Sequence, residues 1–205
     1  MMALERWLRF EIAGRVDRAG VLLLAEHPPG LTLGADASNR DVTDPGRHRP
    51  RWVSRGGGVM LHGPGELIAS LLLPVERLGL GTAALRQRWE QAAVEACGAL
   101  KIAVECHKGP PGLFGRTGQV GVFGMCVERG VCSGGWQLSV ADRPGMQGLV
   151  GNLARVPMSS LTRLNYRPVR PAAVREAMIA ATAEQFGCDD VHVHLGHEQL
   201  RRMRR

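Results

Sequence analysis

A glycine-rich segment carries the residue types that could perform chemistry in this chain. It runs from Ser54 to Glu66 and holds Arg55, three consecutive glycines, and His62 between two turn signals. Consecutive glycines let a ligand approach the backbone and leave amide groups free to point at it. Arg55 could bind an anion or hold the loop, and His62 lies where a rigid scaffold usually positions a loop side chain. The alternative interpretation is a structural glycine-rich connection with a hydrogen-bonded histidine.

A second glycine-rich segment extends from Gly118 to Gly135 and is interrupted by the turn Glu128-Arg129-Gly130. Glycine within a strand indicates that another backbone or a ligand comes close, and the segment predicts two strands joined as a hairpin. Neither segment has the GxGxxG spacing of a dinucleotide-binding turn or the signature of a Walker-type phosphate loop. These two classes of nucleotide site are therefore excluded.

The elements that must position these segments follow from the apolar periodicity. Residues 82–100 and 171–186 have the spacing of amphipathic helices, with Trp89 as a core anchor, and residues 3–18 come close to that spacing. Strands are predicted at residues 21–25, 59–61, 66–73, 102–104, 119–127 and 131–140, with a short terminal strand after residue 187. Because strands follow one another with few helices between them, we expect an α+β fold, in which one mixed or antiparallel sheet is backed by two long helices.

Length and composition indicate one domain over residues 1–205, ending in a basic tail at about 198–205. Hydrophobic residues make up 44% and charged residues 22%, which is typical of a globular protein and excludes wholesale disorder. No apolar run is long enough to span a membrane, and the N-terminus lacks the pattern of a secretory signal. We therefore expect a cytoplasmic monomer that does not associate with membranes.

Charge and cysteine content narrow the classes of partner and cofactor. The net charge of +7 can favour nucleic acid or an acidic protein, but aromatic residues at 4% are too few for a base-stacking surface. The five cysteines include no CxxC pair, which indicates reduced thiols rather than disulfides or a zinc site. No cysteine or carboxylate motif completes a ligand set with His192, His194 and His197. We therefore expect no nucleic acid, no metal and no cofactor.

Three segments resemble motifs of one family. Residues 25–34 are similar to the E-H-P-P-V-Y-T-L-G segment of octanoyltransferases, the enzymes of lipoate biosynthesis within the biotin/lipoate protein ligase superfamily. Residues 55–66 resemble their R-G-G-x-x-T-Y-H-G-P-G-Q segment, and residues 118–135 resemble their K-I-A-A-I-G … R-G-V-T-x-H-G segment. The matching motifs occur in the same order as in the family and extend over residues 3–165.

This resemblance implies a biotin/lipoate protein ligase-like fold with a narrow hydrophobic acyl tunnel. In the family, an octanoyl group moves from acyl carrier protein to a lysine of a lipoyl domain. A cysteine accepts the group as a thioester, and a lysine across the site activates that thiol by lowering its pKa. An octanoyl or lipoyl ligand is therefore implied, as is acyl carrier protein or a lipoyl-domain protein as partner. The implied substrate-binding residues are Arg55, Gly56, Gly57, His62, Gly63, Gly65, Gly121, Gly134 and Gly135.

The chain departs from the family at the reacting positions. The lysine position falls on Gln119, whose amide neither accepts a proton at neutral pH nor carries a charge. The cysteine position falls on Gly151 or on one of the two residues after it, and no cysteine occurs between Cys132 and Cys188. The family's histidine, tyrosine and glutamine are replaced by Gly134, Leu61 and Glu66. The resemblance therefore implies a kept binding loop without the catalytic dyad.

Three functions remain open. We expect a degenerate member that binds an octanoyl or lipoyl group, or an acylated protein, without the usual Cys–Lys transfer. The alternative is an active octanoyl-[acyl carrier protein]–protein acyltransferase with His62 as base, using Cys132 as a relocated nucleophile or direct attack by the acceptor lysine. Cys132 would share a strand face with Gly134 and face the pocket, unless it is a buried inert thiol. The third is a protein-interaction module whose basic tail recruits an acidic partner.

Overall fold

The computed structural model describes residues 2–14, 20–38, 41–42, 49–107, 109, 111–142 and 156–196. Among these residues, six strands form a larger sheet in the spatial order β1-β5-β9-β8-β7-β6, and neighbouring strands are antiparallel. Its members are β1 (Val21–Glu26), β5 (Glu66–Pro74), β6 (Glu105–Cys106), β7 (Gly112–Gly115), β8 (Gly118–Glu128) and β9 (Val131–Ser139). The predicted hairpin is confirmed as β8 and β9, at the centre of this sheet.

A smaller sheet contains β2 (Gly30–Leu33), which pairs in parallel with β3 (Arg51–Trp52) and antiparallel with β4 (Val59–His62). The expectation of one sheet is therefore corrected to two sheets, while the α+β class is confirmed. Pro28 and Pro29 interrupt the chain between β1 and β2, because proline cannot donate a ladder hydrogen bond. The turn at residues 63–65 then redirects the chain from β4 into β5 of the larger sheet.

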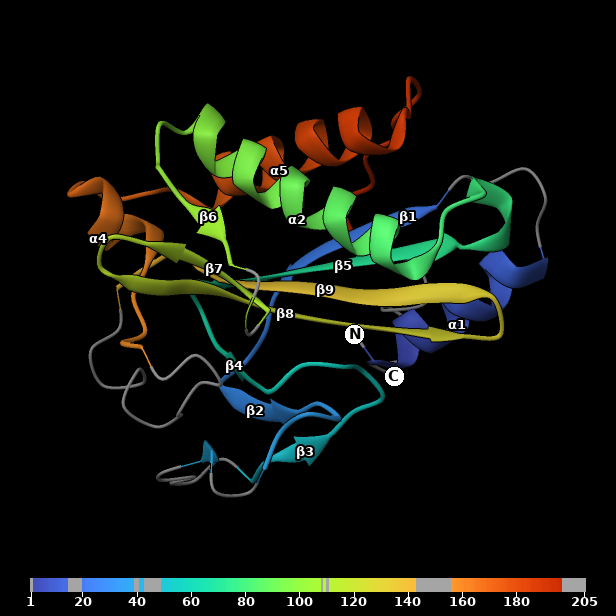
Figure 1. The fold of residues 1–205 in the computed structure, drawn as a ribbon, viewed down its shortest axis with the longest axis horizontal. Coiled ribbons are helices and arrows are strands. Elements are labelled where there is room, and N and C mark those ends of the chain that lie inside the picture. The colour runs from blue at the N-terminus through green and yellow to red at the C-terminus, as the bar shows by residue number, and fades with distance from the viewer. Residues whose placement is uncertain are drawn as a thin grey trace.

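The two long helices are confirmed as α2 (Thr82–Ala99) and α5 (Pro171–Phe186). They pack against each other on one side of the larger sheet, as Figure 1 shows. The short α4 (Leu161–Asn165) and the 3-10 helix η2 (Glu76–Leu78) lie on the same side, where they pack against the same core. Both long helices begin and end close to the predicted positions. In α5, proline is accepted in the first turn at Pro171, and Gly187 adopts the left-handed conformation that ends the helix.

The main hydrophobic core lies between the larger sheet and these helices. The β5 side chains of Leu67, Ala69, Leu71 and Leu73 alternate toward it, as period-two geometry requires. Trp89 of α2 is 2% exposed and joins this cluster, so its predicted role as a core anchor is confirmed. β5 is buried along its whole length, so other parts of the chain cover both of its faces.

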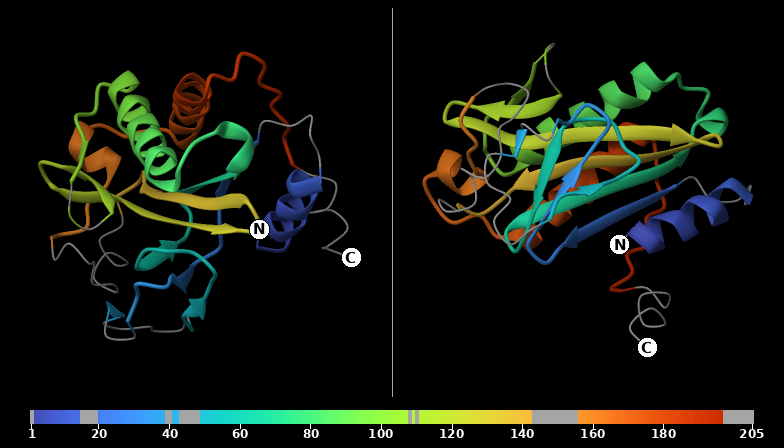
Figure 2. Two further views of the ribbon diagram at one scale, coloured as in Figure 1. Left: turned by 45° about the vertical axis from the view of Figure 1, so that its right-hand side comes forward. Right: turned by 90° about the horizontal axis from the view of Figure 1, so that it is seen from below.

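The opposite face of the larger sheet carries α1 (Met2–Gly14) and the smaller sheet (Figure 2). Three apolar side chains of α1 pack on Leu72 of β5 and Val131 of β9, which alternate away from the helix-covered core. They are Leu4, Leu8 and Ile12. The space that remains on this face, between α1 and the smaller sheet, holds the candidate site.

Two predictions concern the C-terminal part of the chain. The short terminal strand is wrong for residues 188–196, which form no strand even though Val191 and Val193 alternate with histidines. Both valines are exposed and belong to no core cluster of the described residues. The alternating valines therefore do not form the buried apolar face that a strand would need. The basic tail at 198–205 and the position of Gly151 lie outside the described residues. In the described part of the chain, no helix has the length and hydropathy of a membrane span.

Candidate functional site

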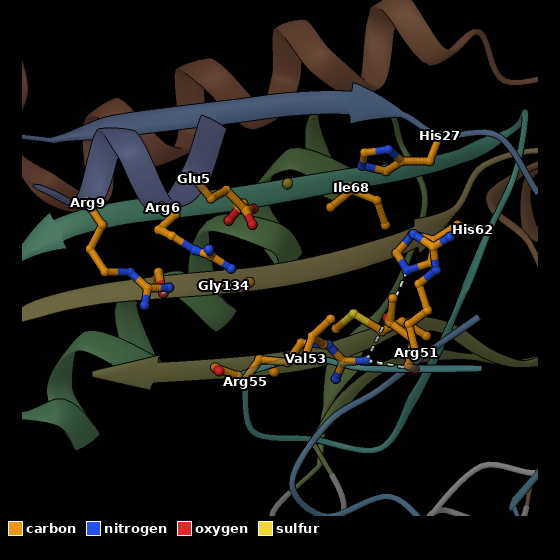
Figure 3. A pocket seen from close by; sticks show the side chains of 18 of the residues that line it. Glu5, Arg6, Arg9, His27, Arg51, Val53, Arg55, His62, Ile68 and Gly134 are labelled. Atoms are coloured by element: carbon orange, nitrogen blue, oxygen red, sulfur yellow. Dashed lines mark hydrogen bonds between the residues drawn. The ribbon is translucent and has the colours of Figure 1, made fainter. Parts of the chain in front are cut away.

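A large cleft opens on the face of the sheet that carries α1. Its volume is about 1370 Å³, and its walls come from α1, from the smaller sheet and from the loop that joins β3 to β4. In Figure 3, Glu5, Arg6 and Arg9 of α1 lie on one side of the cleft, while Arg51, Arg55 and His62 lie on the other. Gly134 and Ile68 lie between these two groups, on the strands that form the floor.

At Gly134, the floor of the cleft presents backbone rather than a side chain. The β5–β9 ladder is continuous up to the pair Ser70–Gly135 and resumes at Leu73–Cys132, so the two strands are unpaired in between. Gly134 has φ +106°, which L side chains rarely adopt, and a Cβ there would overlap the carbonyl oxygen of Gly124. A histidine at position 134 is therefore incompatible with this backbone.

Arg55 ties the loop before β4 to the smaller sheet. Its Nη1 donates to the carbonyl oxygen of Gly56 at 3.0 Å, and its Nη2 donates to the carbonyl oxygen and the Oγ1 of Thr32, both at 3.1 Å. The next loop residues are bonded as well, since the Gly56 amide donates to Met125 of β8 and the Gly57 amide to the Asp36 carboxylate. Arg55 therefore does hold the loop, while its guanidinium still faces the cleft.

His62 continues the same chain of polar groups. Its Nε2 lies 2.8 Å from Thr32 Oγ1, while its Nδ1 is buried and has no hydrogen-bond partner among the described residues. Burial is the largest cause that lowers the pKa of His62, to about 4, with His27 and Arg55 acting in the same direction. The His27 ring contacts it edge-on, with ring centroids 5.4 Å apart. His62 is therefore neutral at pH 7, with Nδ1 open to a hydrogen-bond partner.

The α1 side of the cleft is fixed to the sheet by Arg9. Its Nη1 forms an ion pair with Glu128 of β8, and its Nη2 donates to the Ser133 hydroxyl of β9. Ser133 lies 3.4 Å from the sulfur of Cys126, which in turn donates to the Ser54 carbonyl oxygen. These contacts connect α1, the β8–β9 hairpin and the loop before β4. Sequence analysis assigned no role to Arg9, because its partners are more than 100 residues away along the chain.

Gln119, which the resemblance assigns to the family's lysine position, does not line the cleft. It is 2% exposed, and its Nε2 donates to the carbonyl oxygen of Gly121 at 3.0 Å. Its amide N–H donates to Pro157 and its carbonyl oxygen accepts from Ser159, so the segment after residue 155 lies directly beside it. The side-chain amide neither gains nor loses a proton at neutral pH. Its Oε1 has no partner among the described residues.

The cysteines of the described chain are all free thiols, and Cys132 does not face the cleft. It packs in the core beneath α2, and burial raises its pKa to about 12. The prediction that Cys132 faces the pocket is therefore wrong, because the floor at Gly134 exposes backbone and the Cys132 side chain points to the helix-covered side. A thiol with so high a pKa is a poor nucleophile at neutral pH.

A buried polar network lies behind the cleft and joins the two sheets. Gln137 of β9 donates to the Glu66 carboxylate at 2.6 Å and accepts from the Leu61 amide of β4 at 3.1 Å. The Ser139 hydroxyl also donates to Glu66, at 2.8 Å. Glu66, Gln137 and Ser139 are each at most 2% exposed. Glu66 therefore faces the interior and acts as a shared acceptor for this network.

The predicted substrate-binding residues divide into three groups. Arg55, His62, Gly134 and Gly135 line the cleft, and Gly56 and Gly57 pack against β8 just behind its wall. Three others lie away from the lining: Gly63, Gly65 and Gly121. Within the described ranges, no group of three histidine, cysteine or carboxylate side chains could hold a metal ion. Gly151 lies outside those ranges.

Comparison with known proteins places these features in a family. Residues 1–183 match the model of the lipoyl protein ligase A/B catalytic domain. An octanoyltransferase of Xanthomonas campestris pv. campestris is 34% identical over 175 residues, which cover 81% of this chain and 72% of that protein. Octanoyltransferases of Geobacter sp. strain M21 and Halorhodospira halophila are each 34% identical, and the matches cover 65% and 57% of their own lengths.

The fold is shared with solved structures at much lower sequence identity. One is described as an archaeal lipoylation system from Thermoplasma acidophilum, a bipartite lipoate protein ligase and its E2 lipoyl domain. It superposes with a TM-score of 0.71 at 14% identity, covering 96% of this chain and 86% of that one. With the three matching motifs, the cleft and the family model in agreement, the chain belongs to the octanoyltransferases of the lipoyl protein ligase A/B catalytic-domain family.

Proposed function

We propose that this protein binds an octanoyl or lipoyl group, free or carried on a protein, without the Cys–Lys acyl transfer of its family. The observation that carries the proposal is the buried, uncharged amide of Gln119 at the lysine position, with its Nε2 bonded to Gly121. Without a cation there, nothing at that position lowers the pKa of a thiol or relays its proton. The cleft with Arg55 and His62 on its wall supports retained binding.

The partner proposed is a lipoyl-domain protein or an acyl carrier protein. A structural neighbour is described together with its E2 lipoyl domain, which supports the first choice. The six arginines that line the cleft support an acidic surface on the partner, since opposite charges steer association.

Isothermal titration tests the binding half of this proposal. Octanoyl and lipoyl ligands, acyl carrier protein and a lipoyl domain are titrated separately into the full chain, and at least one is expected to bind. The acceptor lipoyl domain is then weighed by mass spectrometry after incubation with octanoyl-acyl carrier protein and this protein. No gain of an octanoyl group is expected, whereas a catalytically competent octanoyltransferase gives full conversion in the same assay. Absence of binding to every ligand at millimolar concentration contradicts the proposal.

A second candidate function is direct acyl transfer, and one feature favours it. His62 lines the cleft and its Nδ1 lacks a partner within the described chain, so it could accept the proton that the acceptor amine releases as it attacks the acyl carbon. The expected signature is octanoylation of the lipoyl domain that is abolished by His62→Ala and kept in His192→Ala, since His192 is exposed. Equal activity in both variants would rule out this mechanism.

A further inference from the structure

The cleft is larger and more positive than an acyl group alone requires. Its volume of about 1370 Å³ exceeds the range of about 300–1,000 Å³ that is typical of pockets for drug-sized ligands. The described lining holds six arginines and two glutamates, which leaves a formal charge of +4, whereas an acyl thioester is neutral. The size and the charge of the cleft therefore point to a ligand with a large anionic part beside the acyl chain.

Two of the six arginines already interact with an acidic side chain. Arg9 forms an ion pair with Glu128, and the carboxylate of Asp36 acts electrostatically on Arg55. In the part of the chain that the structure describes, no ion pair joins a carboxylate to any of the other four. These four line the cleft and are exposed: Arg6, Arg49, Arg51 and Arg129. Their guanidinium groups are therefore available to an anionic ligand.

The positive charge comes from opposite walls of the cleft. Figure 3 shows Arg6 of α1 and Arg51 of β3 on its two sides, with Gly134 of the floor between them. A folded protein partner meets mainly the rim of such a cleft, whereas a small flexible anion can lie between the walls. Guanidinium groups bind phosphate through two parallel hydrogen bonds. A small ligand with several phosphate groups therefore matches this arrangement better than an acidic protein surface does.

An exposed aromatic side chain lies beside one of these arginines. Phe10 is 74% exposed, lines the cleft and follows Arg6 by four residues, which places both on one face of α1. The packing of α1 on the sheet uses Leu4, Leu8 and Ile12 and does not involve Phe10. Nucleobases stack on aromatic rings, and a neighbouring guanidinium can hold the phosphate of the same nucleotide. Arg6 and Phe10 together therefore fit a phosphorylated nucleotide.

We propose that the cleft binds its acyl group as the thioester of a phosphorylated nucleotide carrier, the chemistry of coenzyme A. The nucleotide lies against Arg6 and Phe10, and the acyl chain lies on the apolar lining that includes Val53, Met60 and Ile68. This inference rests on the proposed function, since it assumes that the cleft takes acyl groups. It concerns only the group that carries the acyl chain, so the lipoyl-domain partner proposed above is unaffected.

Isothermal titration of the full chain at pH 7 tests the inference without any substitution. Octanoyl-N-acetylcysteamine, octanoyl-phosphopantetheine and octanoyl-coenzyme A share one thioester and add first a phosphate and then the nucleotide. Octanoyl-coenzyme A is expected to bind at least about tenfold more tightly than octanoyl-phosphopantetheine, and its affinity is expected to fall as salt is raised. Equal affinities for these two compounds, or tighter binding of octanoyl-acyl carrier protein, overturn the inference and leave acyl binding intact. No binding by any of these ligands contradicts the proposed function too.

Two matched pairs of variants assign the effect to the α1 wall. Arg6→Gln and Arg167→Gln each remove one exposed positive charge, but Arg167 does not line the cleft. Arg6→Gln is expected to lose at least about tenfold in affinity for octanoyl-coenzyme A, with the affinity for octanoyl-N-acetylcysteamine unchanged, and Arg167→Gln is expected to change neither. Equal losses in the two variants would show a general attraction to positive charge and overturn the inference.

The second pair tests the stacking contact. Phe10→Ala and Tyr166→Ala remove aromatic rings of residues that are 74% and 75% exposed, and only Phe10 lines the cleft. Phe10→Ala is expected to lose at least about fivefold in affinity for octanoyl-coenzyme A, whereas Tyr166→Ala is expected to keep the wild-type affinity. Circular dichroism checks that all four variants fold. An unchanged affinity in Phe10→Ala would contradict the placement of the nucleotide on α1.

Discussion

The hydroxyl of Thr32 lies 2.8 Å from Nε2 of His62 and also accepts from the Arg55 guanidinium at 3.1 Å. One side chain of the smaller sheet therefore connects the charged and the neutral polar group of the cleft wall. Burial is the main reason that the pKa of His62 is low and the ring stays neutral, and the positive charge of Arg55 acts in the same direction.

The first prediction concerns pH. The folded-state pKa of His62 is about 4 against a usual 6.5, so the unfolded chain binds the proton first as pH falls. The contribution of His62 to the free energy of unfolding is complete above pH 6.5. It is lost progressively as pH falls toward 4, by up to about 3 kcal/mol. Urea unfolding at pH 7 and pH 4.5 measures this loss. Between these two pH values, His62→Gln is expected to lose less free energy of unfolding than the wild type. His192→Gln is expected to lose as much as the wild type, because His192 is exposed. Equal losses in all three proteins would show that His62 is not the group responsible.

The second prediction concerns the floor of the cleft. Gly134→Ala places a Cβ against the Gly124 carbonyl oxygen at φ +106°, so we expect a loss of about 2 kcal/mol or more in the free energy of unfolding. Gly98→Ala is the control, since Gly98 lies in α2 with nothing within contact distance of an added Cβ. That substitution is expected to stabilise the protein by about 0.5–1 kcal/mol. Similar effects in the two variants would mean that the floor backbone is not as described.

The third prediction concerns the helix-covered core. Trp89→Ala removes an indole that is 2% exposed, and we expect a loss of about 3–5 kcal/mol. Trp52→Ala removes the same side chain from β3, where it is 58% exposed, and is expected to cost less than about 1 kcal/mol. Chemical denaturation of both variants gives the comparison. A small effect at Trp89 would mean that α2 packs on the sheet through another face.

The fourth prediction concerns the α1 wall of the cleft. Arg9→Ala breaks the contacts to Glu128 and Ser133, so amide hydrogen exchange in residues 4–13 is expected to accelerate. The control is Arg167→Ala, which removes an exposed arginine far from these contacts in sequence and is expected to leave exchange in α1 unchanged. Unchanged exchange in Arg9→Ala would show that the apolar contacts of Leu4, Leu8 and Ile12 hold α1 alone.

Much of the scaffold could be predicted because its signals are local. The helical period of residues 82–100, the proline that begins α5 and the turn at Glu128-Arg129-Gly130 each act within a few residues. The Arg55 and His62 loop was predicted for the same reason, since glycine and proline mark it directly. The division into two sheets was missed because strand pairing is a long-range property, and β1 and β5 pair although β2, β3 and β4 lie between them in the sequence.

The cleft itself was only partly predictable. No local pattern indicates that Arg9 of α1 contacts Glu128 and Ser133 of β8 and β9, because that contact depends on how α1 packs on Leu72 and Val131. Cys132 was placed on the wrong side because strand alternation alone does not reveal which face the floor exposes. The positive φ of Gly134 decides that question, and it is a property of the folded backbone.

The central claim is that the chain holds acyl groups without forming an acyl-enzyme, and intact-protein mass spectrometry tests it most directly. The wild type and the double variant Gln119→Lys/Gly151→Cys, which places a lysine and a cysteine where the resemblance implies the family's dyad, are incubated with octanoyl-acyl carrier protein and weighed. We predict no octanoyl adduct on the wild type and an adduct on the introduced thiol of the variant. An octanoyl adduct on the wild type, mapped to any of its own cysteines, would contradict the claim and establish an acyltransferase with a relocated nucleophile.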